Sequence, residues 1–185
     1  MENNIKSKIF TVIYAIVLIA AFIGAVQLLY NAIDMMTYTT FGEYNYGRLQ
    51  KPLAIISLVA ALFSLAGVAS GVASLFVKGK TAQTVCHALI IAAAVILLIS
   101  LTVSSIIWVT YLKENNSNYV KPPYNILGNK DFPLYSAVMA MLVPQFAYFV
   151  VLAALHIWDL VKSIKREKSV DQTEDKDGVA TEEVK

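Results

Sequence analysis

The chain has 185 residues, of which 57% are hydrophobic and only 15% are charged, with a formal net charge of +2. This composition, with a mean hydropathy of +0.60, excludes an ordinary water-soluble domain. The small net charge gives no reason to expect a nucleic-acid partner. The charges are also segregated, because four stretches contain no Asp, Glu, Lys or Arg: 9–33, 53–77, 84–112 and 134–158. Since a membrane-spanning helix needs about 20 apolar residues, the sequence predicts an all-α, integral membrane four-helix bundle.

The first predicted helix covers 9–33 and follows a short polar segment that contains Lys6 and Lys8. A cleaved signal peptide is the alternative interpretation, because basic residues precede an apolar core and Ala25 could lie at a cleavage site. The apolar run is longer than the about 7–15 residues of a signal core and continues beyond Ala25. We therefore expect this segment to remain as the first span.

The second predicted helix, 53–77, carries small residues at four-residue spacing. Gly67 and Gly71 form a GxxxG pair, and a second file is offset from it by one residue: Ala66, Ser70 and Ser74. Small residues allow helix backbones to approach closely in a membrane. We expect this helix to be the central packing element. Its small-residue face receives either another helix of the same chain or a second copy of the protein.

A short basic turn, 78–83, leads into the third predicted helix, 84–112. Cys86 lies at the membrane boundary of that helix, where a cysteine is either a buried thiol or a palmitoylation site. Trp108 and Tyr111 are expected at its far interface, as in an aromatic belt. Asn115 begins an Asn-Asn-Ser sequence that fits a glycosylation acceptor in the loop that follows.

The fourth predicted helix, 134–161, contains Pro144, which is expected to kink it. Beyond it, positive residues alternate with an apolar stripe, which predicts a basic surface helix to about residue 168. The last segment, 169–185, has six acidic residues and no aromatic residue, which predicts a disordered acidic tail. The sequence thus divides into a four-span membrane domain, 1–168, and this tail.

Positive charge is concentrated at three of the segments that flank the predicted spans. The two longer loops carry five basic residues, whereas these three segments carry eight. The eight are Lys6, Lys8, Lys78, Lys80, Lys162, Lys165, Arg166 and Lys168. Because cytoplasmic segments carry the excess of Lys and Arg, we expect both termini in the cytoplasm. The last six of these residues could also bind anionic lipid headgroups, although topological bias alone explains them. A plasma membrane or another membrane of the secretory pathway is expected.

The predicted spans contain no charged residue in their apolar cores, which disfavours a pump, a proton-coupled transporter or a voltage sensor. Hydroxyl residues within them could line a passive pore or serve in helix packing. His87 and His156 lie at similar depth on the third and fourth helices. They could hold a haem iron or a metal together, or face the lipid headgroups separately. We expect no cofactor, since the sequence has no other metal-ligand cluster, nucleophile triad or phosphate-binding glycine loop.

This plan resembles the four-span tetraspan class that includes MARVEL-domain and claudin-like proteins. The resemblance lies in a short inner N-terminus, outer loops of about 20 residues, a tight inner turn and a cytosolic tail. It concerns topology only, because 34–52 lacks the Trp and Cys pair of a claudin loop and 113–133 lacks the cysteines of a tetraspanin loop. The resemblance implies a four-span fold and assigns no functional residue.

From these features we expect a non-enzymatic membrane protein. It would organise a membrane patch or act as an accessory subunit, through lateral helix packing and aromatic-rich outer loops. Its partners would be membrane lipids and either another membrane protein or a second copy. The alternatives are a passive channel or transporter component and, third, a redox carrier that uses His87 and His156.

Overall fold

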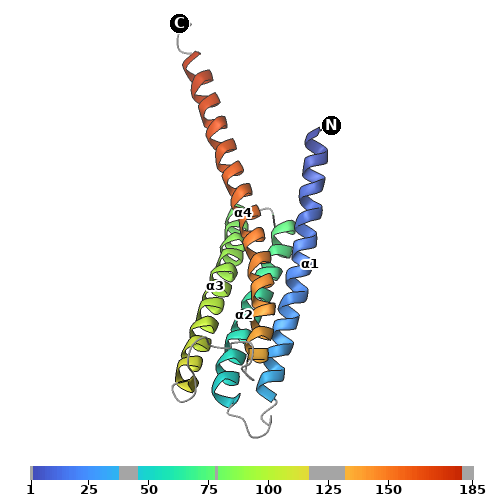
Figure 1. The fold of residues 1–185 in the computed structure, drawn as a ribbon. Coiled ribbons are helices and arrows are strands. Elements are labelled where there is room, and N and C mark those ends of the chain that lie inside the picture. The colour runs from blue at the N-terminus through green and yellow to red at the C-terminus, as the bar shows by residue number, and fades with distance from the viewer. Residues whose placement is uncertain (1, 38–45, 78, 117–131, 181–185) are drawn as a thin grey trace.

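A computed structural model of the chain describes residues 2–37, 46–77, 79–116 and 132–180, with side chains described between residues 10 and 161 except near the loops. Its elements are four long helices: α1 (Glu2–Thr37), α2 (Tyr46–Phe76), α3 (Lys80–Asn116) and α4 (Phe132–Ala180). They lie side by side as a single bundle (Figure 1). The predicted all-α four-helix bundle is confirmed.

Each helix contains a candidate membrane span: Phe10–Thr37, Leu49–Phe76, Lys80–Lys113 and Leu134–Val161. Their outer faces carry large apolar side chains, of which Ile16 and Ile19 are each 61% exposed and Ile106 is 58% exposed. Such continuous apolar surface is rare on soluble proteins but is the normal surface of a helix in lipid. The four spans and their apolar exterior indicate an integral, multi-pass membrane protein, as predicted.

The helices form a ring in chain order, in which α4 also packs against α1. Across the ring α2 contacts α4, whereas the described residues of α1 and α3 do not contact each other. Within an apolar 18-residue window of each span, half of the α2 residues are buried, against 28% in each of the other three. The prediction that this helix is the central packing element therefore agrees with the structure.

Both chain ends emerge at one end of the bundle (Figure 1). An even number of antiparallel helices requires this arrangement, whichever side of a membrane that end occupies. The turn between α2 and α3 lies at this same end, so the expected cytoplasmic segments share one face of the bundle.

The glycines of α2 lie inside the bundle. A Cβ atom at Gly67 would collide with the Phe149 ring of α4 and would lie 3.0 Å from the Ala93 Cβ of α3. At Gly71 it would lie 2.7 Å from Leu18 of α1. The small-residue face therefore receives three helices of the same chain, including α4, which the sequence did not suggest.

The second small-residue file is only partly inside. Ser70 is buried and donates its hydroxyl to the Ala66 carbonyl at 2.8 Å. Ser74 is half-buried, whereas the Ala66 side chain is exposed on the outer face of α2. Since Ala66 immediately precedes Gly67, the helical rotation of about 100° per residue points the Ala66 side chain away from the face on which the Gly67 Cα lies. Within one copy of the chain, Ala66 therefore does not pack with the glycines.

A glutamine ties α4 to α1 near the middle of the bundle. Gln145 is fully buried, and its Nε2 donates to the Ala21 carbonyl at 2.8 Å. Its Oε1 lies against Gly24, where a Cβ atom would collide with it. The preceding residue, Pro144, lies within a continuous α4. Gln145 thus forms an interhelical hydrogen bond, the usual role of an amide side chain within a span.

The helix ends differ from the sequence prediction. Helix α2 begins at Tyr46 instead of 53, and Leu49, at 1% exposed, extends its buried stripe backwards. Gln50 Nε2 also donates to the Met35 carbonyl at 2.6 Å, which ties this first part of α2 to α1. Helix α4 continues to Ala180, whereas disorder was predicted from 169. Lengthening an existing helix adds one hydrogen bond per residue and avoids the unfavourable nucleation step.

Aromatic residues close the other end of the bundle. Trp108 is only 4% exposed and stacks on Tyr135 of α4, with ring centroids 4.8 Å apart and an interplanar angle of 4°. Tyr111 continues the stack at 6.0 Å from Trp108. Trp108 lies near the far end of its span, where it was expected, and its large apolar ring is buried against α4.

Candidate functional site

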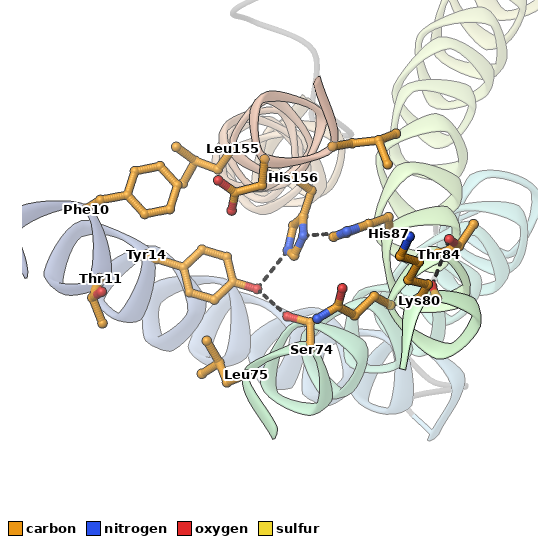
Figure 2. Close-up of a pocket in the computed structure, with 13 residues that line it drawn as sticks. Phe10, Thr11, Tyr14, Ser74, Leu75, Lys80, Thr84, His87, Leu155 and His156 are labelled. Atoms are coloured by element: carbon orange, nitrogen blue, oxygen red, sulfur yellow. Dashed lines mark hydrogen bonds between the residues drawn. The ribbon is translucent and has the colours of Figure 1, made fainter. Parts of the chain in front are cut away.

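Three polar aromatic side chains from three helices meet near the end where both termini emerge. His156 of α4 lies in the centre, with its Nε2 2.8 Å from the Tyr14 hydroxyl of α1 and its Nδ1 2.7 Å from Nδ1 of His87 of α3. Figure 2 shows the His156 ring between the other two. Tyr14 and His156 are each 5% exposed. We call this arrangement the His–His–Tyr chain.

Helix α2 supplies the hydrogen-bond partners at the Tyr14 end of the His–His–Tyr chain. The Tyr14 hydroxyl lies 3.0 Å from the Gly71 carbonyl, to which it can donate, and 3.3 Å from Ser74 Oγ. Ser74 donates to the same carbonyl at 2.7 Å. A Cβ atom at Gly71 would lie 3.2 Å from the Tyr14 hydroxyl. The glycine therefore lets the tyrosine reach the α2 backbone, so that all four helices are joined at this level.

The hydrogen-bonding protons of the His–His–Tyr chain can be arranged in two opposite directions. If Tyr14 donates to Gly71, then His156 Nε2–H must donate to Tyr14, and His87 Nδ1–H must donate to His156. A neutral imidazole has one N–H and one lone pair, so His87 Nε2 is then an acceptor. If Tyr14 donates to His156 instead, every step reverses and His87 Nε2 becomes a donor. Whether His87 Nε2 is a donor or an acceptor therefore depends on the direction of the hydrogen bonds in the His–His–Tyr chain.

The two imidazoles can hold at most one additional proton between them. The Nδ1–Nδ1 hydrogen bond requires a lone pair on one side, and a fully protonated imidazole has none. If His156 takes the extra proton, it donates at both nitrogens and His87 keeps its proton on Nε2. If His87 takes it, Nε2 again carries a proton. An added proton therefore makes His87 Nε2 a donor in either case.

A cavity of about 440 Å³ adjoins the chain and is lined by all four helices. Its lining residues are Phe10, Thr11, Tyr14, Ser74, Leu75, Lys80, Gln83, Thr84, His87, Leu155, His156, Asp159 and Leu160. The buried Tyr14 and His156 form its floor. Lys80, Asp159 and Leu75 are exposed and form its rim. The cavity therefore has buried polar side chains at its base and exposed ones at its rim, and Figure 2 shows side chains that line it.

The hypothesis that the histidines share a metal can be compared with their geometry. Two nitrogens bound to one zinc at about 2.0–2.1 Å in tetrahedral geometry lie about 3.3 Å apart. The facing nitrogens of His87 and His156 are 2.7 Å apart, which is a hydrogen-bond distance. Within the described parts of the chain, no group of three or more His, Cys, Asp or Glu side chains could hold a metal. As arranged, the pair forms a hydrogen bond.

The remaining predicted site residues are scattered relative to this cavity. Lys80 lies at its mouth, whereas Lys78 is outside the described residues. Cys86 is buried, in the position expected of an unmodified thiol. Four basic residues of the predicted lipid-binding rim lie on α4 beyond its described side chains, namely Lys162, Lys165, Arg166 and Lys168. Asn115 lies in the last turn of α3, and its side chain is also outside the described part.

Sequence reasoning paired the two histidines but missed Tyr14. The depth of Tyr14 could have indicated that it lies beside the histidines. It is about one turn inside the first span, and the histidines lie at a similar depth on their helices. A tyrosine hydroxyl within a span needs a hydrogen-bond partner. What the sequence could not supply is the rotation of α1, which points this residue inward while Thr11 is exposed.

No family model, curated protein or solved structure matches this chain. The resemblance to four-span proteins therefore remains one of helix number and order. The function has to be argued from the bundle and its site.

Proposed function

We propose that this protein is a non-enzymatic membrane component that organises a membrane patch or acts as an accessory subunit, through lateral contacts of its helices. In this proposal both termini lie in the cytoplasm, and the segments that join α1 to α2 and α3 to α4 face the opposite side. The membrane is the plasma membrane or another membrane of the secretory pathway. The basis for the orientation is the excess of Lys and Arg in the segments at the terminal end of the bundle.

The observation that carries the proposal is the filled centre of the bundle. The Phe149 ring occupies the space beside Gly67, and the Gln145 amide occupies the space beside Gly24. Both side chains are fully buried. These contacts join α4 to α2 and α1 at mid-height, where a pore through a single chain would have to pass.

The outer surface supports the same proposal. All four helices present large apolar side chains outward, including Ile16 on α1, Ile55 on α2 and Ile106 on α3. Inside the bundle, Gln145 Nε2 and the His–His–Tyr chain form hydrogen bonds between helices. The protein therefore meets its surroundings within the membrane through apolar helix faces, which suit lipids and other spanning helices.

A passive channel component is the second candidate, and one observation favours it. The hydroxyls of Ser57, Ser64 and Ser104 are buried, and none has a hydrogen-bond partner. Unpartnered buried hydroxyls commonly bind internal water. A hydrated path along α2 and α3 would have to open beside Phe149 before it could conduct.

Site-specific photocrosslinking combined with a flux assay tests the proposal. A photoreactive residue is placed singly at Ile16, Ile55 or Ile106 in cells, and at the buried Ala61 as the matched interior control. We expect one outward position to yield a discrete protein adduct, either a partner or a second copy, and Ala61 to yield only internal links. Purified protein in liposomes is expected to leave ion flux at the protein-free level. Flux above that level, without an adduct at any outward position, would overturn the proposal in favour of the channel.

A further inference from the structure

The buried residues of α1 and α4 recur at alternating spacings of three and four positions. In α1 the series runs from Tyr14 to Met35, and in α4 it runs from Val138 to His156. This is the seven-residue repeat of helices that pack as a left-handed coiled coil, and the buried residues of α2 and α3 include the same spacing. Side chains from the four helices therefore meet in layers, and the contacts between helices give the level of each layer.

One layer, which we call the glutamine layer, contains Ser64 of α2 and Gln145 of α4. These two helices run in the same direction (Figure 1), and Gly67 lies against the Phe149 ring. Ser64 comes three residues before Gly67, and Gln145 comes four residues before Phe149. The rise of about 1.5 Å per residue therefore places both side chains at nearly the same level. Gln145 Nε2 bonds to the α1 backbone, but its Oε1 and the Ser64 hydroxyl have no hydrogen-bond partner among the described residues.

A second layer, which we call the serine layer, contains Ser57 of α2 and Ser104 of α3. These helices are antiparallel (Figure 1), and Gly67 lies beside Ala93. Ser57 comes ten residues before Gly67, and Ser104 comes eleven residues after Ala93. Both serines therefore lie at nearly the same distance from that contact. Both are fully buried, and neither hydroxyl has a hydrogen-bond partner within the described part of the chain.

Hydroxyl groups elsewhere in the bundle bond to their own helix. Ser70, Thr102 and Ser105 each donate to the carbonyl of the residue four positions earlier, at 2.8–2.9 Å. The serines of the glutamine and serine layers form no such bond. A buried hydroxyl or amide oxygen without a partner is unfavourable, and internal water commonly supplies the missing hydrogen bond. These two layers are therefore where water inside the bundle would be held.

The side chains around these groups are small. Gly24 of α1 lies against Gln145 Oε1, and Ala25 beside it is fully buried. Ala60, which lies between the two layers on α2, is fully buried as well. A buried water needs room and about 2–4 polar partners. Each layer supplies two such partners, and they come from different helices.

We propose that an internal water molecule binds in each of these two layers. In the glutamine layer it accepts the hydroxyl proton of Ser64 and donates to Gln145 Oε1. In the serine layer it bridges the hydroxyls of Ser57 and Ser104, accepting from one and donating to the other. The two waters link α2 to α4 and to α3 inside the bundle. They need no conducting path, so the proposal does not depend on the scaffold function and holds for a closed channel component as well.

Labelling by hydroxyl radicals that X-rays generate from water tests these sites in the purified full chain in mild detergent. Such radicals attack side chains next to the water that produced them, so a buried residue is labelled only beside bound water. Leu97, four residues after Ala93, lies in the glutamine layer. Val138, eleven residues before Phe149, lies in the serine layer, whereas Leu152, three residues after Phe149, lies in an apolar layer. Leu97, Val138 and Leu152 are all fully buried.

In the unchanged protein, mass spectrometry should find Leu97 and Val138 modified and Leu152 unmodified. The Ser64→Ala variant loses one partner of its water, so the modification of Leu97 should fall to the level of Leu152 while that of Val138 stays the same. The Ser70→Ala variant is the matched control, because it removes a buried hydroxyl that is already bonded to its own helix. It should change the labelling of neither residue.

The double variant Ser57→Ala/Ser104→Ala should have the opposite effect, with Val138 protected and Leu97 still modified. Unfolding curves confirm that each variant is folded. Equal modification of Leu97 and Leu152 in the unchanged protein would overturn the proposal, whatever the variants do. Modification of Val138 that is as strong in the double variant as in the unchanged protein would overturn the site in the serine layer, since its water would not depend on the two hydroxyls.

Discussion

The Tyr14 hydroxyl is the atom at which α1, α2 and α4 are joined. It lies within hydrogen-bond distance of the Gly71 carbonyl and of His156 Nε2, and Ser74 Oγ is close by. Tyr14 is only 5% exposed, so little water can replace a lost partner of its hydroxyl. A single oxygen atom therefore contributes to the orientation of three helices.

Replacement of this oxygen should destabilise the bundle. In the Tyr14→Phe variant the ring remains but His156 loses its partner at Nε2, so we expect a loss of about 1–3 kcal/mol in the free energy of unfolding. Unfolding in mixed micelles of mild detergent and dodecyl sulfate measures it. Tyr30→Phe is the matched control, because Tyr30 is on the same helix and 73% exposed. Equal stability of the two variants would contradict the structural role assigned to Tyr14.

The site shows which residues a sequence can bring together. His87 and His156 could be paired from depth alone, since each lies near the same end of an uncharged run. Their hydrogen bond, and the place of Tyr14 beside them, depend on how each helix is rotated about its axis. Hydrophobic periodicity normally supplies that rotation, but a membrane helix is apolar on all sides and the periodicity is weak. Gln145 was predictable as an interhelical donor, whereas its acceptor on Ala21 was not.

At the scale of the element, α2 is organised by two neighbouring residues with opposite surroundings. Gly67 faces Phe149 inside the bundle, whereas Ala66 is exposed on the outer face. Both are small, and the sequence alone placed both on one packing face. The structure therefore separates the internal packing surface of α2 from the surface that another protein could use.

The two residues allow a direct test of that separation. Gly67→Ile adds a branched side chain where even a Cβ atom collides with Phe149, so we expect it to lower the folded fraction, at a cost of about 1–3 kcal/mol or more. Ala66→Ile should leave the folded monomer intact. Size-exclusion chromatography and unfolding curves in detergent measure both effects. A folded Gly67→Ile monomer that has lost dimers would instead show that the glycine joins two copies.

The existence of the four helices was predictable because an apolar run of more than about 20 residues has few alternatives in a membrane. Their ends were less predictable. The first turns of α2 are held by Leu49 and Gln50, whose contacts with the rest of the bundle no local pattern reveals. The burial of Trp108 escaped prediction for a similar reason, because its stacking partner Tyr135 comes from another helix.

At the scale of the whole molecule, the N- and C-termini share one end of the bundle (Figure 1). The excess of positive charge in the segments at that end leads us to place it in the cytoplasm. Labelling of single cysteines in a Cys86→Ala background tests this orientation. We expect a membrane-impermeant maleimide to label Asn118→Cys on intact cells and Val184→Cys only after permeabilisation. The reverse pattern would invert the topology but leave the fold unchanged.

The contacts between α1 and α4 have a consequence for how the protein is made. Spans are synthesised and inserted one after another, and then associate within the bilayer. The α1–α2 hairpin can form early, because the Tyr14 hydroxyl can already bond to Gly71 and Ser74 of α2. His156 and Gln145 reach α1 only after the last span has left the ribosome. Until then the Tyr14 hydroxyl and the Ala21 carbonyl of the early hairpin lack their partners on α4.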